Sequence, residues 1–494
     1  MIKTYSVIVK VITYFFILLF FYAAISKILD FENFQVQIGQ SPLLTAYAGA
    51  ISYGVILIEF IIVAMLTIPL TRLSGLYAST ALMSAFTIYI FLILNYSEFV
   101  PCSCGGILEK MNWTEHLIFN VTCVVIGIVA IYLENIIRNL SRRKSIYFLI
   151  ISNLSGIALV IILFISSEHI IKKENNFTRR FFPNGLIEQE KRELDSDFYY
   201  FAGQDLTNIF LGNITRPLEA KILSKNLSSS SDFKIQLDTY VYLYKNLRLQ
   251  IKLPYYYLHD GSVPVIFRGI IGNPAAENIS YKDAYFDQLA VLDSTRFVFR
   301  TISGKTKAFT LGVLDLNDEK KVKLHPEILK KQMDGIFDSD GLLISESDRQ
   351  RLIYTYTYRN QLILMNQNIN DHLIQNTIDT TSVAKIKTTT LSDGRKKMSA
   401  PSYRVNKLQA IYKKYLFNNS NLMGKNESQK KWKSASIIDI YNIENHTYVG
   451  SVYIPDRNHK KVSGLIITED HLYAIIGTEI ISYGFRESLL KTLK

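Results

Sequence analysis

Residues 76–96, LYASTALMSAFTIYIFLILNY, form one long apolar stretch without a charged side chain. A helix of about twenty such residues covers the roughly 30 Å hydrocarbon core of a bilayer. Similar runs flank this one at residues 5–25, 46–66, 116–133 and 146–166. The sequence therefore predicts a multi-pass helical membrane part with five spans. We expect the first run to be retained rather than cleaved as a signal peptide, because it is long and three more spans follow closely.

The basic residues at the ends of these runs predict the orientation. They gather at the start of the chain, between spans two and three, and between spans four and five: Lys3, Lys10, Arg72, Arg138, Arg142, Arg143 and Lys144. The alternate loops carry only Lys27 and Lys110. Because Lys and Arg accumulate in cytoplasmic loops, the N-terminus is predicted inside. The part after the fifth span is then periplasmic, in a protein of the bacterial inner membrane.

Two of the three cysteines, Cys102 and Cys104, lie in the polar loop 101–106 between spans three and four, on the predicted outer side. A close thiol pair can attack a disulfide with one sulfur and resolve the mixed disulfide with the other. The small ring that this pair closes is expected to be strained and easily reduced. The alternative is a static disulfide, or two inert thiols, because a reactive thiolate needs a stabilising neighbour. Lys110 and His116 are the nearest candidates.

Glu59 lies in the middle of the second span, where a carboxylate is costly and normally points into the helical bundle. It is a candidate for carrying protons or binding a quinone headgroup; a quinone is the only cofactor that the sequence brings into question. The alternative for Glu59 is a hydrogen-bonded packing residue. Cys123, inside the fourth span, is interpreted as a small buried apolar residue.

Lys27 and His116 lie near the predicted outer ends of their spans. Lys27 has three interpretations: a salt bridge to Asp30 or Glu32, stabilisation of a thiolate, or a side chain that extends to the interface. His116 follows Trp113 closely, so it fits a polar cap in the aromatic belt as well as a supporting role beside the cysteines.

The rest of the chain has no cysteine, which excludes a secreted domain stapled by disulfides. It consists of short runs rich in Tyr, Phe, Ile and Val, separated by Gly, Asp and Asn, and these predict β-strands. Hairpins open near residues 199, 255, 342 and 465, and a recurrence of about 50 to 60 residues is typical of four-stranded propeller blades. An all-β propeller of about six blades is predicted; two β-sandwiches are the alternative. Short helices are expected at 326–333 and 405–416.

The composition also limits the function of this outer part. The net charge of +12 is spread over a long chain without an arginine-rich run, so no nucleic-acid partner is expected. Asp338 and Asp340 resemble part of a calcium loop, but the surrounding positions favour a turn. No metal-spaced His/Cys set, nucleophile elbow or phosphate loop occurs, so no metal is predicted and this part is interpreted as a binding platform. The basic residues at 172–180 are interpreted as a solvated stalk near lipid headgroups.

The membrane part resembles a known family. Residues 24–34, AISKILDFENF, are similar to the "small-x-x-Lys-Leu-x-Asp-x-x-x-Phe" signature of MauE/DoxX-like membrane proteins. Glu59 lies in a stretch similar to the family's second span, and Cys102-x-Cys104-Gly105-Gly106 is similar to its Cys-x-Cys-Phe-Gly. The resemblance implies a redox-associated four-helix bundle that acts on disulfides with a periplasmic thioredoxin-like partner, in some members during maturation of methylamine dehydrogenase.

The chain departs from that family at Gly105 and in its appended outer domain, which indicates another client. The predicted organisation is a four-span domain at 1–137, a basic loop and fifth helix at 138–166, a linker at 167–190 and the propeller-like domain at 191–494. Two functions remain open. One is a membrane component of thiol–disulfide exchange with Cys102 and Cys104 as catalytic residues, and the other is a non-catalytic, membrane-anchored propeller that acts as a sensor or adaptor.

Overall fold

The computed structural model describes residues 2–31, 34–35, 38, 48–96, 112–171, 175, 177–346, 351–391, 396–400 and 402–493. The contacts divide the chain into two compact units. The first consists of Met1–Lys173 and Ile386–Ser402, and the second of Glu174–Lys385 and Tyr403–Lys494.

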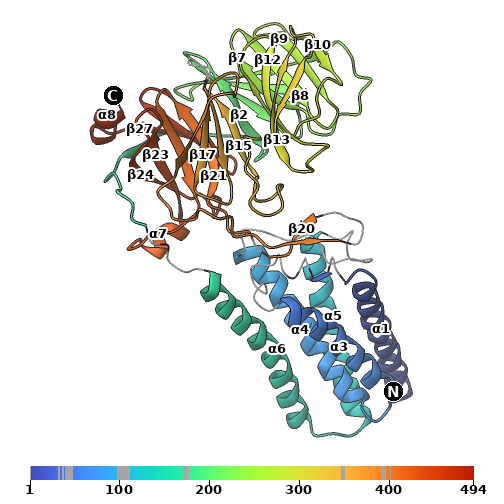
Figure 1. The fold of residues 1–494 in the computed structure, drawn as a ribbon. Helices are drawn as coiled ribbons and strands as arrows, with labels where there is room; N and C mark the ends of the chain where they lie inside the picture. The colour runs from blue at the N-terminus through green and yellow to red at the C-terminus, as the bar shows by residue number, and fades with distance from the viewer. Residues whose placement is uncertain are drawn as a thin grey trace. The chain divides into compact units, whose positions relative to one another are not determined.

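The first unit contains five long apolar helices (Figure 1). They are α1 Ile2–Leu29, α3 Ala48–Thr67, α4 Arg72–Tyr96, α5 Trp113–Ile137 and α6 Arg142–Ile171. Each is long and apolar enough to cross a membrane, which confirms the five predicted spans. Most extend past the predicted apolar runs, because polar and basic residues add a further turn at the ends. A short hairpin, β19 Thr388–Thr390 with β20 Lys396–Met398, also belongs to this unit.

The helices of the bundle pack closely where small residues meet. A side chain at Gly127 in α5 would lie 2.6 Å from the Thr80 hydroxyl of α4, so only glycine permits this approach. Helix α6 packs against α4 in the same way, since Gly156 lies against the Ala81 carbonyl. A hydrogen bond of 2.6 Å from Ser84 to Asn153 joins these two helices inside the unit.

The second unit is a six-bladed β-propeller. Its first three sheets contain β2 Tyr199–Gln204, β3 Asn208–Asn213, β4 Glu219–Ser224 and β5 Ser230–Lys234; β7 Arg248–Lys252, β8 Tyr255–Asp260, β9 Val265–Ile270 and β10 Ala275–Tyr281, with the short β6 Gln236–Leu237 on the outer edge; and β11 Gln288–Val291, β12 Arg296–Ile302, β13 Phe309–Asp315 and β14 Val322–His325. In each sheet, the four main strands follow chain order and pair antiparallel.

The remaining three sheets have the same order except at the closure of the ring. They contain β15 Gly341–Ser345, β16 Leu352–Tyr356, β17 Gln361–Met365 and β18 His372–Asn376; β21 Asn406–Tyr412, β22 Tyr415–Ser420, β23 Ala435–Asn442 and β24 Thr447–Pro455; and β25 Val462–Ile467, β26 His471–Ile476, β27 Glu479–Phe485 and β1 Leu186–Glu193. Strand β1 pairs antiparallel with β27, so the start of the domain supplies the outer strand of the last blade. The hydrogen bonds of this pairing close the ring.

The apolar cores distinguish a propeller from two sandwiches. Each pair of neighbouring blades shares a buried cluster, such as Ile353 with Tyr441 between the fourth and fifth blades and Tyr199 with Tyr473 between the first and last. Further clusters fill the other interfaces between neighbouring blades. Two sandwiches would instead have two large separate cores. The predicted fold class is therefore confirmed, and the sandwich alternative is wrong.

Two local predictions in this unit are wrong. Residues 326–333 form a loop, and 405–416 contain the hairpin of β21 and β22 instead of a helix. Lys413, at φ +51°, makes the turn of that hairpin. The described helices of this unit are α7 Gln429–Lys433 and α8 Glu487–Leu493. The spacing of apolar residues in 405–416 resembles that of a helix, but pairing with neighbouring strands decides the structure.

Residues 177–185, before β1, are attached to the propeller and do not form a solvated stalk; residues 172–174 and 176 lie outside the described residues. Arg179 is 0 % exposed and binds Asp439 and Glu427, each at 2.7 Å. Phe181 stacks on Tyr453 with ring centroids 4.2 Å apart. Burial works to lower the pKa of Arg179, but Asp439 and then Glu427 outweigh it, so the pKa is raised. The sequence analysis placed the Arg179 charge near lipid headgroups. In the structure, this charge is buried against the fifth blade.

Candidate functional site

The centre of the candidate site is an ion pair inside the helical bundle. Glu59 lies about three turns into α3 and is 0 % exposed. Its Oε1 accepts a bond of 2.6 Å from Lys27 Nζ of α1, whose side chain is 15 % exposed. The Lys27 ammonium also lies 5.7 Å from the centre of the Phe34 ring. Thus Lys27 and Glu59, named separately from the sequence, are partners.

Glu59 is only half satisfied by this pair. Its second oxygen, Oε2, is buried and has no hydrogen-bond partner among the described residues. A buried polar atom without a partner costs about 1–3 kcal/mol, and more when it carries charge. A cation on one side and an unpaired oxygen on the other are suited to holding and exchanging a proton.

His116 is positioned by the start of α5. Asn112 caps this helix: its side chain accepts from Glu115 N at 2.8 Å, and Glu115 returns a bond to Asn112 N. His116 N donates to Asn112 O at 2.9 Å, so the imidazole lies in the first turn. Its ring stacks on Trp113, with centroids 6.1 Å apart.

The imidazole of His116 belongs to the same site as the ion pair. It lies close enough to Lys27 for the two groups to interact electrostatically. Its Nδ1 is buried and has no partner in the described part of the chain. Of the three supporting residues predicted from the sequence, the structure therefore pairs Lys27 with Glu59 and brings His116 within electrostatic reach of Lys27.

Asn120 is a further buried polar residue of α5, and the sequence analysis missed it. It lies one turn after His116 on the buried face of α5, is 2 % exposed, and its Nδ2 has no acceptor among the described residues. The available signal was its position: residues 116, 120 and 123 fall on one face of a helix. Cys123 itself is buried in the apolar cluster that includes Phe16 and Phe20, as predicted.

The predicted catalytic residues Cys102 and Cys104, and Lys110, lie outside the described residues. Their sequence positions connect them to the site. The loop that contains them follows α4, which ends at Tyr96, and leads directly into the helix start that holds His116. Their place as catalytic residues stays a prediction.

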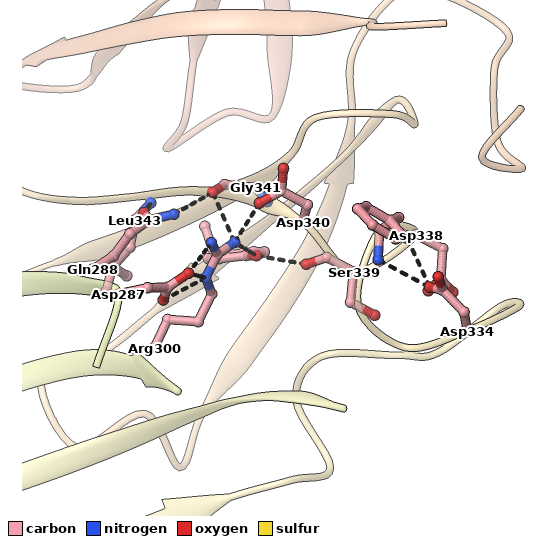
Figure 2. A network of polar contacts seen from close by, with 11 residues as sticks. Asp287, Gln288, Arg300, Asp334, Asp338, Ser339, Asp340, Gly341 and Leu343 are labelled. Atoms are coloured by element: carbon pink, nitrogen blue, oxygen red, sulfur yellow. Dashed lines mark hydrogen bonds and ion pairs between the residues drawn. The ribbon is translucent and has the colours of Figure 1, made fainter. Parts of the chain in front are cut away.

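The propeller contains a larger polar network, and its contacts are structural (Figure 2). Arg300 of β12 binds Asp287, Asp340 at 2.7 Å and the Tyr354 hydroxyl at 2.9 Å, which ties the third blade to the fourth. Gln288 reinforces this junction through both Gly341 O and Leu343 N. Every charged group at this junction thus has a protein partner.

The Asp338 carboxylate accepts bonds from the backbone N–H groups of Gln332, Met333 and Gly335. Burial works to raise the pKa of Asp338, but a bond from Asp334 and these N–H groups outweigh it and lower the pKa. Asp338 therefore braces a turn, as the sequence favoured over a calcium loop. No group of three or more His, Cys, Asp or Glu residues suited to a metal ion occurs in the described part of the chain.

Residues 5–133 match the family model of methylamine utilisation protein MauE. This match covers the first four helices, in agreement with the resemblance read from residues 24–34, and we call this part the MauE-like bundle. No curated protein matches the chain significantly.

Several solved structures resemble part of this chain. A member of the DUF4221 family from Bacteroides vulgatus is 12% identical with a TM-score of 0.41, and covers 64% of this chain and 99% of its own. A luciferin-regenerating enzyme is 10% identical with a TM-score of 0.36, over 61% and 96%. YCF48 bound to D1 peptide is 8% identical with a TM-score of 0.36, over 63% and 98%. At these TM-scores no property of those proteins is transferred to this chain.

Proposed function

We propose that the protein is a membrane component of thiol–disulfide exchange, with Cys102 and Cys104 as its exchanging pair on the periplasmic side. The observation that carries the proposal is the buried Lys27–Glu59 ion pair with its unpartnered Glu59 Oε2, together with the buried, unpartnered side-chain nitrogens of His116 and Asn120 on α5 among the described residues. Buried ionisable groups in a membrane span mark a functional site by default. The match of residues 5–133 to MauE supports the redox assignment.

The exchange needs only these two sulfurs and a partner. A client thiolate attacks the Cys102–Cys104 disulfide, the S–S bond breaks, and one of the two sulfurs leaves as a thiolate. A second client thiolate then attacks the mixed disulfide, so the client gains a disulfide and the pair becomes a dithiol. Two electrons and two protons have moved to the pair. A thioredoxin-like disulfide or a membrane quinone takes them back, and Lys27, Glu59 and His116 hold protons during this step.

A glutathione assay tests the exchange directly. Purified full-length Cys104→Ser protein is incubated with oxidised glutathione, and its intact mass is measured. Cys102 should retain one glutathione, because the resolving sulfur is missing. Wild-type protein should instead lose two hydrogens and retain no adduct, and Cys123→Ala should behave like wild type. The proposal fails if both single serine variants stay unmodified.

The second candidate is a non-catalytic, membrane-anchored sensor or adaptor. It is favoured by the propeller, where Arg300 and Arg179 are held by protein carboxylates and so belong to the scaffold. The double variant Cys102→Ser/Cys104→Ser separates the two functions. Loss of the protein's cellular function, with normal amounts of the variant in the membrane, supports exchange. An unchanged cellular function supports the adaptor.

A further inference from the structure

The segment that enters the propeller is bound to one of its connections. Three residues, 172–174, lie between the end of α6 at Ile171 and Asn175. Asn175 N donates to Met423 O, and Lys425 N donates to Phe177 O at 2.7 Å. The connection between β22 and β23, which contains Met423 and Lys425, therefore holds the start of the second unit.

This connection presents a basic surface around one tryptophan. Helix α7 contributes exposed Lys430, Lys431 and Lys433, and Trp432 lies between them in the sequence. Lys461 of the β24–β25 connection places its Nζ 5.5 Å from the centre of the Trp432 ring. The basic patch is defined by Lys425, Lys430, Lys431, Lys433, Lys460 and Lys461. Glu427, which precedes α7, is held by buried Arg179 at 2.7 Å.

A shallow polar hollow lies within the basic patch. It is lined chiefly by Lys407, Asn419, Ser420, Asn421, Trp432 and Lys461. Asn419 is 3 % exposed, and its Nδ2 has no acceptor among the described residues. An unmet buried donor in a hollow that carries lysine charge requires an acceptor oxygen, and an anionic oxygen fits it best.

We propose that the basic patch docks acidic phospholipid headgroups of the leaflet from which α6 emerges. The phosphate oxygen meets Asn419 and the lysines, while Trp432 takes the interfacial position that tryptophan prefers. Docking would fix the propeller against the bilayer. This inference does not depend on the exchange chemistry proposed above.

Tryptophan fluorescence of the full-length protein tests the docking. The chain has two tryptophans, so Trp113→Phe leaves Trp432 as the single reporter. This variant is placed in nanodiscs of phosphatidylcholine alone and of phosphatidylcholine with phosphatidylglycerol, each with or without a headgroup spin label. Acidic lipid should shift the emission to the blue and at least double the quenching. Because each basic residue near an anionic surface strengthens association about fivefold, Lys430, Lys431 and Lys433→Gln together should remove the effect.

A matched control separates the basic patch from net charge. Lys305, Lys307 and Lys320→Gln remove the same charge from exposed positions in the third blade and should leave the quenching intact. Equal loss in both triple variants, or equal quenching in neutral and acidic nanodiscs, would overturn the proposal. Inorganic phosphate added to neutral nanodiscs should not shift the emission. A shift with phosphate alone would assign the hollow to a soluble anion and overturn the lipid assignment.

Discussion

Two buried charges, one in each unit, differ in how fully they are paired. Arg179, in the propeller, binds two carboxylates, the Ser420 hydroxyl and the Leu422 carbonyl, so its donors are used. Glu59, in the MauE-like bundle, has one partner among the described residues and leaves one oxygen unpaired. A buried polar group without a partner is costly and calls for an explanation. The contrast supports the proposal that Glu59 belongs to a reactive site and Arg179 to the scaffold.

The largest effect should come from breaking the satisfied pair in the propeller. Arg179→Met leaves Asp439 and Glu427 buried without their cation, which should lower the free energy of unfolding by about 3–5 kcal/mol. Thermal unfolding followed by circular dichroism measures this. Arg216→Gln is the control, because its pair with Asp195 is solvent-exposed and its loss should lower the free energy of unfolding far less. An equal decrease in the free energy of unfolding in both variants would contradict the expected difference between buried and exposed ion pairs.

Breaking the Lys27–Glu59 pair in the bundle should show that the two buried charges stabilise each other. Lys27→Leu leaves the Glu59 charge buried and should cost about 3 kcal/mol or more, whereas Lys27→Leu/Glu59→Leu removes both charges and should cost less than that single change. Unfolding in detergent measures stability, and the glutathione assay measures exchange. Both variants should exchange at least tenfold more slowly than wild type. A double variant with wild-type exchange would exclude the pair from the site.

A smaller effect should distinguish a site residue from a scaffold residue, because the two substitutions below should change stability in opposite directions. Asn120→Leu removes the unpartnered Nδ2 and should raise bundle stability by up to about 1–3 kcal/mol, while it slows exchange. Asn153→Leu is the matched control in the same bundle. Asn153 accepts from Ser84 at 2.6 Å, so its loss should lower stability by about 1 kcal/mol. Destabilisation by both substitutions would show that Asn120 is a packing residue.

The smallest effect concerns an exposed pair of the propeller. The bond from Arg216, and then that from Tyr199, lower the pKa of Asp195 to about 2. Because the folded pKa lies below the unfolded value, the pair stabilises the fold above about pH 4 and this contribution is lost as the pH falls toward 2. Carboxyl titration by NMR should place the midpoint of Asp195 near 2, and Arg216→Gln should raise it toward the ordinary value. An unchanged midpoint in that variant would assign the low pKa to another cause.

The sequence predicted what depends on local pattern. Long apolar runs are enough to identify five spans, and hairpins at regular spacing are enough to identify the blades. Strand β1 was not predicted: Leu186–Glu193 is mostly polar and exposed, and only pairing with β27 makes it a strand. The partners of Arg179 are more than 240 residues away, so no local pattern indicates that it is buried.

The candidate site was predicted only in part, because contacts between distant segments leave no local pattern in the sequence. Lys27, Glu59 and His116 each stood out because charge or imidazole is rare in an apolar run, but their meeting depends on how three helices pack. Asn120 did not stand out, since asparagine is a weaker signal than a charge. Its role follows from the unpaired Nδ2, which only the packing of α5 reveals.

Counting reactive thiols in native membranes tests the central claim most directly. Membranes with the full-length protein are treated with a mild oxidant or a reductant, denatured and labelled with a maleimide polymer, and the adducts on the chain are counted by gel shift. If Cys102 and Cys104 form a reversible disulfide, the chain should carry three adducts after reduction and one after oxidation, with Cys123 as the remaining thiol. Re-reduction should restore three. Three adducts under every condition would contradict exchange by Cys102 and Cys104.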